Sequence, residues 1–205
     1  MENHSNHIEE PRDDYAAKLG MWLFIFTELL LFGGLFLVYS IFRFKFPVQF
    51  HQASLELNVI IGAANTVILL VSSMTVAMSL SALQKNNKKL AKILLLITVF
   101  CALLFLVNKY FEWGVKFEEG LYPGSDLMLQ LEHGSLLYFS LYFFMTGLHA
   151  LHIIIGMIIL LVAYFKINSG QVNIDKYALL ENGALYWHLV DLIWIFLFPL
   201  LYLIS

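Results

Sequence analysis

Five acidic or histidine side chains lie deep within long apolar stretches of this 205-residue chain. They are Glu28, His149, His152, His188 and Asp191. A charged side chain at the centre of a lipid bilayer is costly, roughly 2.5–3.5 kcal/mol for aspartate on insertion scales. Each of these groups therefore needs a hydrogen-bonding partner, a proton or a function. Side chains of these types can bind and transfer protons, hydrogen-bond neighbouring helices or ligate a metal.

The composition identifies the elements that must carry these residues. The chain is 60% hydrophobic and 13% charged, whereas soluble domains are about half apolar and a quarter charged. Five apolar runs reach the length of about 20 residues that a membrane helix needs, and they do not alternate as barrel strands would. The runs cover residues 19–42, 57–83, 90–111, 135–165 and 179–204. We therefore expect an all-α bundle of five transmembrane helices, with a polar tail over 1–18 and one membrane domain over 19–205.

Basic residues orient the predicted bundle. The N-terminal tail and the connections on its side hold eight lysine or arginine residues, and the opposite side holds four. Short cytoplasmic loops carry the excess of positive charge in membrane proteins. We expect the N-terminus in the cytoplasm and the C-terminus in the periplasm of a bacterial cytoplasmic membrane. The longest outer loop is predicted over 112–133, with a turn at 122–125.

The helical rise of 1.5 Å per residue places the five ionisable groups at similar depths. Glu28 and His188 come out roughly 14 Å from the cytoplasmic edge, and Asp191 roughly 18 Å. His152 and His149 come out roughly 20 and 24 Å from that edge. The histidines of the fourth run are three residues apart, as are His188 and Asp191, so each pair shares a helix face.

Three interpretations of these groups remain open. Neutral histidines and carboxyl groups could join the helices by mutual hydrogen bonds. They could instead form a protonatable cluster, in which Glu28 is neutral because the membrane interior disfavours its charged form. Finally, His149, His152 and His188 could supply haem or metal ligands, although no redox motif accompanies them.

Four segments of the chain resemble subunit III of the haem–copper oxidases, the superfamily of cytochrome c and quinol oxidases. They occur in the family's order and match its buried helix carboxylate and its histidine motifs. The segments are residues 20–34 (GMWLFIFTELLLFGG), 65–73 (NTVILLVSS), 146–156 (TGLHALHIIIG) and 185–194 (LYWHLVDLIW). Together they extend the resemblance over residues 19–204, in the short five-helix bacterial form of the family.

The resemblance implies a role that the residues alone do not. Subunit III holds no redox centre and no metal; haem and copper lie in partner subunits. It packs beside catalytic subunit I, with subunit II and in some complexes a small subunit IV, and it binds ordered phospholipid. It supports proton uptake and aerobic respiratory electron transport, and Glu28 falls at the family's carbodiimide-reactive carboxylate. No nucleic-acid partner is expected.

The chain also departs from the family pattern. Lys109 replaces the first of two acids that the family usually has three residues apart, so that acid's role does not transfer; Lys109 could instead pair with Glu112. Ala150 replaces the glycine between the two histidines. For lipid contact, we name the aromatic residues Trp22 and Trp187 and the basic residues Lys85 and Lys88 as candidates.

We therefore expect a non-catalytic subunit of a proton-pumping terminal oxidase. The electron donor stays open, because related short forms serve cytochrome c oxidases, quinol oxidases and nitric oxide reductase-type complexes. A haem-bearing membrane cytochrome that handles quinol itself is the rival class.

Overall fold

The computed structural model describes residues 14–174 and 176–203. This part of the chain is helical throughout its regular structure and contains five long helices and two short ones. The long helices are α1 (Asp14–Lys45), α3 (Val59–Gln84), α4 (Lys88–Glu118), α6 (His133–Asn168) and α7 (Ala178–Tyr202). The short helices are α2 (Pro47–Leu55) and α5 (Asp126–Gln130). The five long helices are each apolar and long enough to cross a membrane, which confirms the predicted all-α, five-span class.

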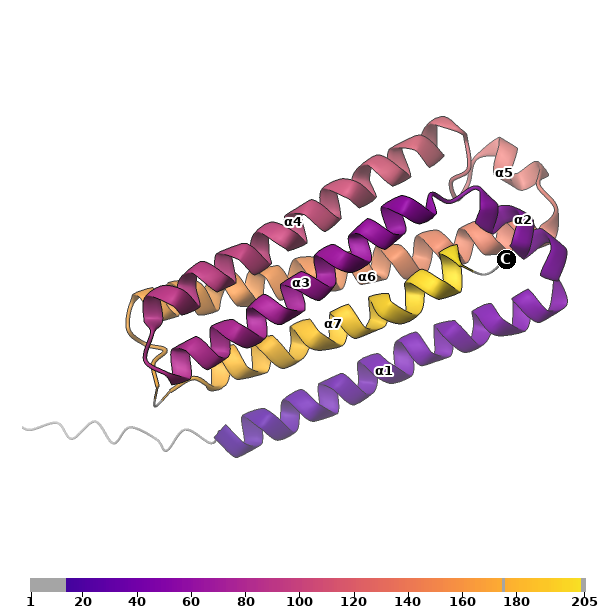
Figure 1. Cartoon of the computed structure of the whole chain (residues 1–205). Coiled ribbons are helices and arrows are strands. Elements are labelled where there is room, and N and C mark those ends of the chain that lie inside the picture. The colour runs from indigo at the N-terminus through magenta and orange to yellow at the C-terminus, as the bar shows by residue number, and fades with distance from the viewer. Residues whose placement is uncertain (1–13, 175, 204–205) are drawn as a thin grey trace, which may run out of the picture.

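The long helices run alternately up and down along one common direction (Figure 1). The helices α2 and α5 and the end of α7 lie at one end of the bundle, which we call the α2–α5 end. The α3–α4 turn and the start of α1 lie at the opposite end. The longest helix, α6, has 36 residues and is about 54 Å long, whereas the hydrocarbon core is about 30 Å thick. The bundle therefore projects beyond the hydrocarbon layer.

Local sequence explains where several helices begin. Asn58 and Asn87 are N-caps, and their side-chain oxygens accept hydrogen bonds from backbone N–H groups of the first turns of α3 and α4. Pro47 opens α2, where its missing N–H costs no helical hydrogen bond. Between α3 and α4, Asn86 adopts the left-handed conformation with φ of 59°, a region that asparagine tolerates better than most residues.

The predicted outer loop over 112–133 is wrong in its first part. Helix α4 continues to Glu118, and α5 occupies the middle of the segment. The predicted turn at 122–125 is present, with Gly124 at φ of 92°. The charged residues that suggested a loop, Glu112 and Lys116, are buried inside the protein on α4. Their charge is satisfied by neighbouring side chains, so a charged sequence did not end the helix.

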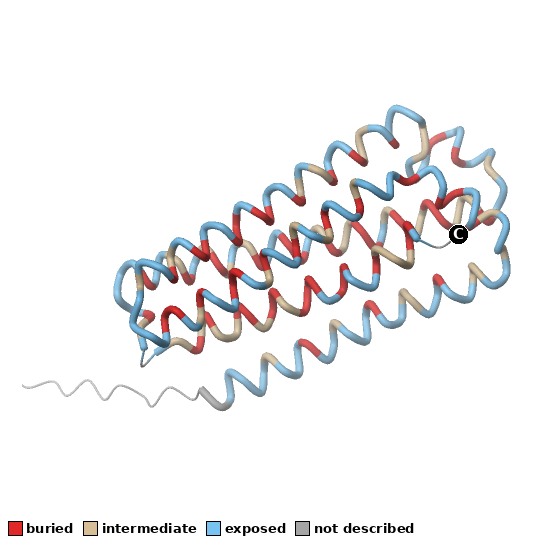
Figure 2. The backbone as a smooth tube through the Cα atoms, in the orientation of Figure 1, coloured by how far each residue is buried: buried red, intermediate tan, exposed pale blue. Residues whose placement is uncertain are grey.

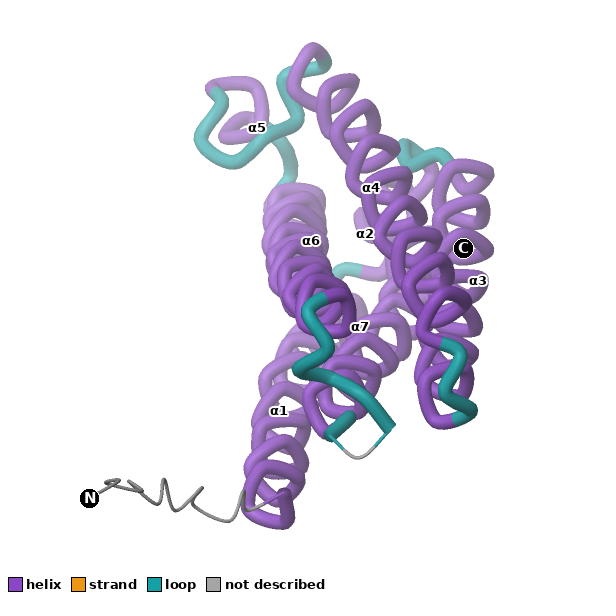
Figure 3. Tube along the Cα trace, turned by 90° about the vertical axis from the view of Figure 1, so that its left-hand side faces the viewer, coloured by secondary structure: helices purple, strands orange, loops and turns teal. Residues whose placement is uncertain are grey.

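Four helices form the core and α1 flanks them. Contacts join α3 to α4, α4 to α6, α6 to α7 and α7 back to α3, while α1 packs mainly on α7 and α6. Figure 2 shows buried positions along the facing sides of the helices, and Figure 3 shows α1 at the edge of the bundle. Of the five spans, α1 has the smallest buried share. Most of its apolar side chains are therefore left for lipid or another membrane protein.

Polar side chains join the core helices at several levels. Thr75 of α3 hydrogen-bonds Thr98 of α4 at 2.8 Å. From α7, the indole N–H groups of Trp187 and Trp194 donate to hydroxyl oxygens on α3, each at 3.0 Å. Because lipid tails are as apolar as leucine, such hydrogen bonds and close packing hold membrane helices together better than apolar surface alone does.

Candidate functional site

The buried carboxyl group of α1 meets a histidine of α6. Glu28 Oε2 lies 2.9 Å from His152 Nε2, and the two side chains are 14% and 8% exposed. The imidazole is held between aromatic rings, with Phe32 edge-on at 5.4 Å and Tyr186 stacked at 6.5 Å between ring centroids. Two groups of the first and fourth runs whose predicted depths differ by roughly 6 Å are thus in direct contact.

Hydrogen bonding defines the proton content of this pair. His152 Nδ1 lies 2.7 Å from the Leu148 carbonyl oxygen. Because a carbonyl only accepts, Nδ1 must carry a proton. One further proton is then shared along the bond between His152 Nε2 and Glu28, either on the carboxyl group or on the ring. Both arrangements have zero net charge, so the pair can hold a movable proton without an uncompensated charge in the membrane.

The other predicted acid and histidine pair faces a different helix. His188 Nδ1 lies 2.6 Å from the Ser73 hydroxyl oxygen on α3. Asp191 is buried, and within the described residues its carboxylate oxygens have no hydrogen-bonding partner, although Ser73 and Cys101 are close enough to interact with it electrostatically. The face shared by His188 and Asp191 is therefore directed to α3 and α4, away from Glu28.

His149 occupies a third environment. The side chain is fully buried between Phe105, edge-on at 5.5 Å, and Trp194, stacked at 5.2 Å between centroids. Neither ring nitrogen has a hydrogen-bonding partner among the described residues. His149 and His152 share a helix but serve different interfaces, since the first faces α4 and α7 and the second faces α1.

The five ionisable groups that were expected at similar depths in the membrane are thus divided among separate sites. Glu28 contacts His152, and within residues 14–174 and 176–203 no hydrogen bond joins it to His188 or Asp191. Over the same residues, three potential metal ligands do not come together at any point. The geometry supports proton exchange at the Glu28–His152 pair.

A second buried polar network lies nearer the α2–α5 end. Lys109 Nζ donates to Glu112 Oε2 at 3.0 Å and to the hydroxyl oxygens of Tyr202 and Tyr142 at 2.8 and 3.3 Å. Both tyrosine hydroxyls donate to Glu112 Oε1. The ammonium also lies 5.3 Å from the centroid of the Trp194 ring. The sequence indicated the Lys109–Glu112 pairing, but it gave no sign that α6 and α7 would supply the two tyrosines.

The four lipid-contact candidates occupy different surroundings. Trp22 is exposed on α1, and Lys85 is exposed at the α3–α4 turn, where Lys88 is partly buried. Trp187 is fully buried, and its indole N–H donates a hydrogen bond to the Ser72 hydroxyl of α3. Its ring is therefore not available to bulk lipid. The physical reason is its rotational position on α7, which the sequence alone does not fix.

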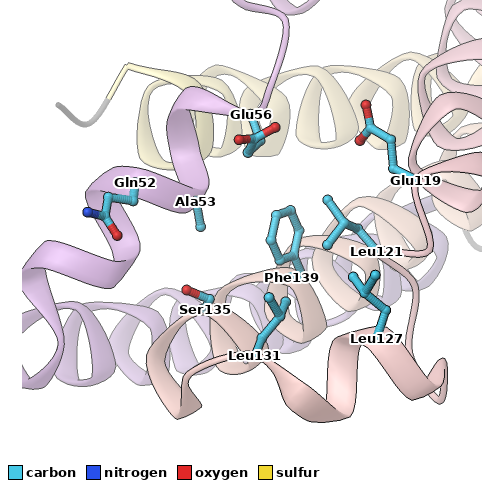
Figure 4. Close-up of a pocket in the computed structure, with 9 residues that line it drawn as sticks. All are labelled: Gln52, Ala53, Glu56, Glu119, Leu121, Leu127, Leu131, Ser135 and Phe139. Atoms are coloured by element: carbon cyan, nitrogen blue, oxygen red, sulfur yellow. The ribbon is translucent and has the colours of Figure 1, made fainter.

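An open cavity of about 370 Å³ lies at the α2–α5 end. Figure 4 shows the carboxylates of Glu56 and Glu119 along one edge and leucines along the opposite edge. Lys116 Nζ lies 2.5 Å from the Glu119 carboxylate and 3.9 Å from that of Glu56. The acidic edge is therefore partly neutralised from within the protein.

The fold and the Glu28–His152 pair define a multi-pass membrane protein with a protonatable pair at a helix interface. A family model for cytochrome c oxidase subunit III matches residues 6–205. The chain belongs to this family, as its sequence motifs predicted.

Individual relatives of the chain are also named as subunit 3 or subunit I+III of such oxidases. The chain is 30% identical over 201 residues to cytochrome c oxidase subunit 3 of Thermostichus vulcanus, covering 98% of this chain and 92% of that protein. It is 28% identical to the probable quinol oxidase subunit 3 of Staphylococcus saprophyticus, covering 100% and 98% of the two chains. It is also 33% identical to the haem–copper oxidase subunit I+III of Aeropyrum pernix. That match covers 97% of this chain and 24% of the longer relative.

Proposed function

We propose that this chain is a non-catalytic subunit III of a proton-pumping haem–copper terminal oxidase in a bacterial cytoplasmic membrane. It stabilises the catalytic subunit I, binds phospholipid and supports proton uptake during aerobic respiration. Haem and copper belong to its partner subunits, which include subunit II and in some complexes a small subunit IV.

The observation that carries the proposal is the Glu28–His152 pair in a chain of this family. A carboxyl group and an imidazole that share one proton at 2.9 Å can buffer or relay it without a net charge in the membrane. The exposed apolar side chains of α1 support an adjoining membrane subunit. The fused subunit I+III of Aeropyrum pernix supports a catalytic subunit as that neighbour.

The electron donor has two candidates. Relatives named as cytochrome c oxidase subunits and as quinol oxidase subunits both match over nearly the whole chain. A quinol oxidase or a nitric oxide reductase-type complex is therefore the alternative within this class. A membrane cytochrome that holds haem in this chain is the rival outside it, with His149 as the buried imidazole that lacks a partner in the described structure.

Purification through a tag on this chain tests the proposal. We expect the chain to bring down a haem-bearing catalytic subunit whose Soret absorption stays with that subunit when the complex is dissociated. Its own thermal stability should be higher in the complex, because binding to the folded state stabilises it. A Soret band that follows this polypeptide would favour the rival cytochrome, and a stable monomer that never co-purifies with haem would refute the oxidase assignment.

The proposed orientation gives a second prediction. With the N-terminus cytoplasmic, a reporter inserted at Asn87 in the α3–α4 turn should be active in the cytoplasm. A reporter fused after Ser205 should be active in the periplasm. Paired alkaline phosphatase and fluorescent protein fusions measure both positions. The reverse pattern would show that the bundle has the opposite orientation in the membrane.

A further inference from the structure

The open cavity at the α2–α5 end has an apolar floor and an acidic edge (Figure 4). The apolar lining residues come from α2, from α6 and from the segment between α4 and α6, and they are Ala53, Leu121, Leu127, Leu131 and Phe139. Glu56 and Glu119 supply the acidic edge, and Gln52 and Ser135 add an amide and a hydroxyl group. The volume of about 370 Å³ is at the lower end of the range typical of small-ligand pockets. The cavity can therefore hold an extended side chain, but it is too small for a helix about 10–12 Å wide.

The two carboxylates of the acidic edge share one cation. Lys116 Nζ lies 2.5 Å from the Glu119 carboxylate and 3.9 Å from that of Glu56. The first distance is a short, charge-assisted contact, whereas the second is at the limit of an ion pair. The Glu56 side chain is 58% exposed. One carboxylate at the edge of the cavity is therefore still available to a cation from outside the chain.

The surface around the cavity is also acidic. Residues 47–58 and 116–135, which contain α2, α5 and most of the cavity lining, hold five carboxylates and one lysine. Among these carboxylates, Glu118, Asp126 and Glu132 are exposed. An excess of one charge attracts segments of the opposite charge and disfavours segments of the same charge. Because the acidic surface extends beyond the cavity, it suits a basic polypeptide better than a single small cation.

The occupant also needs an apolar part. The helices on either side of α5, α4 and α6, have 31 and 36 residues and are about 46 and 54 Å long, whereas the hydrocarbon core is about 30 Å thick. A hydrocarbon layer centred on these helices ends before it reaches α5. Leu127 of α5 lines the cavity and is 50% exposed. Lipid tails therefore do not cover this leucine, and contact with another protein would.

We propose that this cavity is the docking site for one basic side chain, a lysine or an arginine, of a neighbouring protein subunit. The aliphatic stem of that side chain lies over Leu127 and Phe139, and its cationic head group binds Glu56. Lysine and arginine combine an apolar stem with a terminal charge, as the floor and the edge of the cavity require. The inference rests on the proposed function, which makes this chain part of a complex and places the α2–α5 end in the periplasm.

The chain offers two matched pairs of variants. Glu56→Gln removes the available carboxylate, while Lys116 keeps its other carboxylate partner at 2.5 Å, so no buried charge is left unpaired. Glu118→Gln is its control, because it removes the same charge from the same end of the bundle but outside the cavity lining. Leu127→Asn makes the apolar floor polar. Leu129→Asn, on the same short helix and outside the lining, is its control.

Photo-crosslinking in the intact, affinity-purified complex tests the proposal. The crosslinker p-benzoylphenylalanine replaces Leu55, which is 68% exposed, adjacent to Glu56 and outside the cavity lining. We expect mass spectrometry to identify a peptide of another subunit, crosslinked at or next to a lysine or arginine. Glu56→Gln should lower the yield about two- to fivefold, as loss of a partly exposed ion pair implies, and Leu127→Asn should lower it by a similar factor. High salt should also lower the yield, and both control variants should stay close to the unmodified complex.

Co-purification of a haem-bearing subunit is scored in every sample, so that failure of the docking site is distinguished from failure of the proposed function. In an intact complex, the docking site would be refuted by the lack of a crosslink to another subunit, or by a crosslink that neither Glu56→Gln nor Leu127→Asn weakens. It would also be refuted by a crosslink to a second copy of this chain. A small amine that native mass spectrometry finds on the complex and that Glu56→Gln removes, without any crosslinked peptide, would assign the cavity to a free ligand instead. If no haem-bearing subunit co-purifies, the proposed function fails and this inference fails with it.

Discussion

Replacing Glu28 with alanine is expected to destabilise the complex, whereas replacing it with glutamine is expected to remove only its proton chemistry. His152 Nδ1 donates to the Leu148 carbonyl, so in the neutral ring Nε2 is an acceptor. The amide of glutamine can donate to that nitrogen, and the hydrogen bond survives. Alanine leaves Nε2 buried without its partner, at a cost of about 1–3 kcal/mol.

Proton uptake and infrared spectroscopy measure the functional part of this prediction. In Glu28→Gln, we expect normal assembly, slower proton uptake or faster loss of activity during turnover, and loss of the infrared signal of the Glu28–His152 pair. Glu118→Gln is the control, because Glu118 is exposed on α4. Unchanged uptake, pumping and turnover lifetime would make the pair purely structural. Complete loss of oxygen reduction in a fully assembled complex would contradict a supporting role for this chain.

Replacing Lys109 with methionine is expected to cause the largest loss of stability. The Lys109 and Glu112 side chains are only 3% and 4% exposed. Removing one partner of a buried ion pair leaves an uncompensated charge and costs about 3–5 kcal/mol. The hydroxyls of Tyr142 and Tyr202 can stabilise the remaining carboxylate only in part, because they also lose the ammonium that they contact.

A double-mutant cycle distinguishes the ion pair from simple packing. Glu112→Gln alone should also destabilise the protein, because it leaves the ammonium unpaired. The variant with both changes should lose much less than the sum of the two single losses. The exposed control Lys89→Met should stay within about 0.5 kcal/mol. Thermal release of this chain from the purified complex is the measurement, and additive losses would show that the two charges are not coupled.

The sequence determined the class of the protein and the depth of its polar groups. Continuous, non-alternating apolar runs of membrane length satisfy their backbone hydrogen bonds as helices, so five spans followed from the number and length of these runs. The rise per residue then placed Glu28 and His152 at similar depths in the membrane. The three-residue spacing of Lys109 and Glu112 likewise indicated their pairing, which the structure confirms at 3.0 Å.

Charge along the chain was a less dependable guide to helix ends. The segment after residue 111 looked like an acidic loop, but α4 continues to Glu118 because Glu112 is satisfied by Lys109 and two tyrosines. Those tyrosines come from α6 and α7, far away in the sequence. A buried charge is tolerated only where such partners meet, and local sequence does not report whether they do.

Tertiary structure alone decided which groups at the same depth touch. Depth follows from position along a helix, but the direction in which a side chain points depends on how each helix is rotated against its neighbours. That rotation brings His152 to Glu28 and directs His188 to Ser73, and it leaves His149 between two aromatic rings. It also places Tyr39 and Arg43 in the lining of one cavity and Gly33 in the lining of another, each of which includes residues of α7. Packing between helices sets these rotations through many contacts distant in sequence, so the sequence indicated the depths of these groups but not which of them touch.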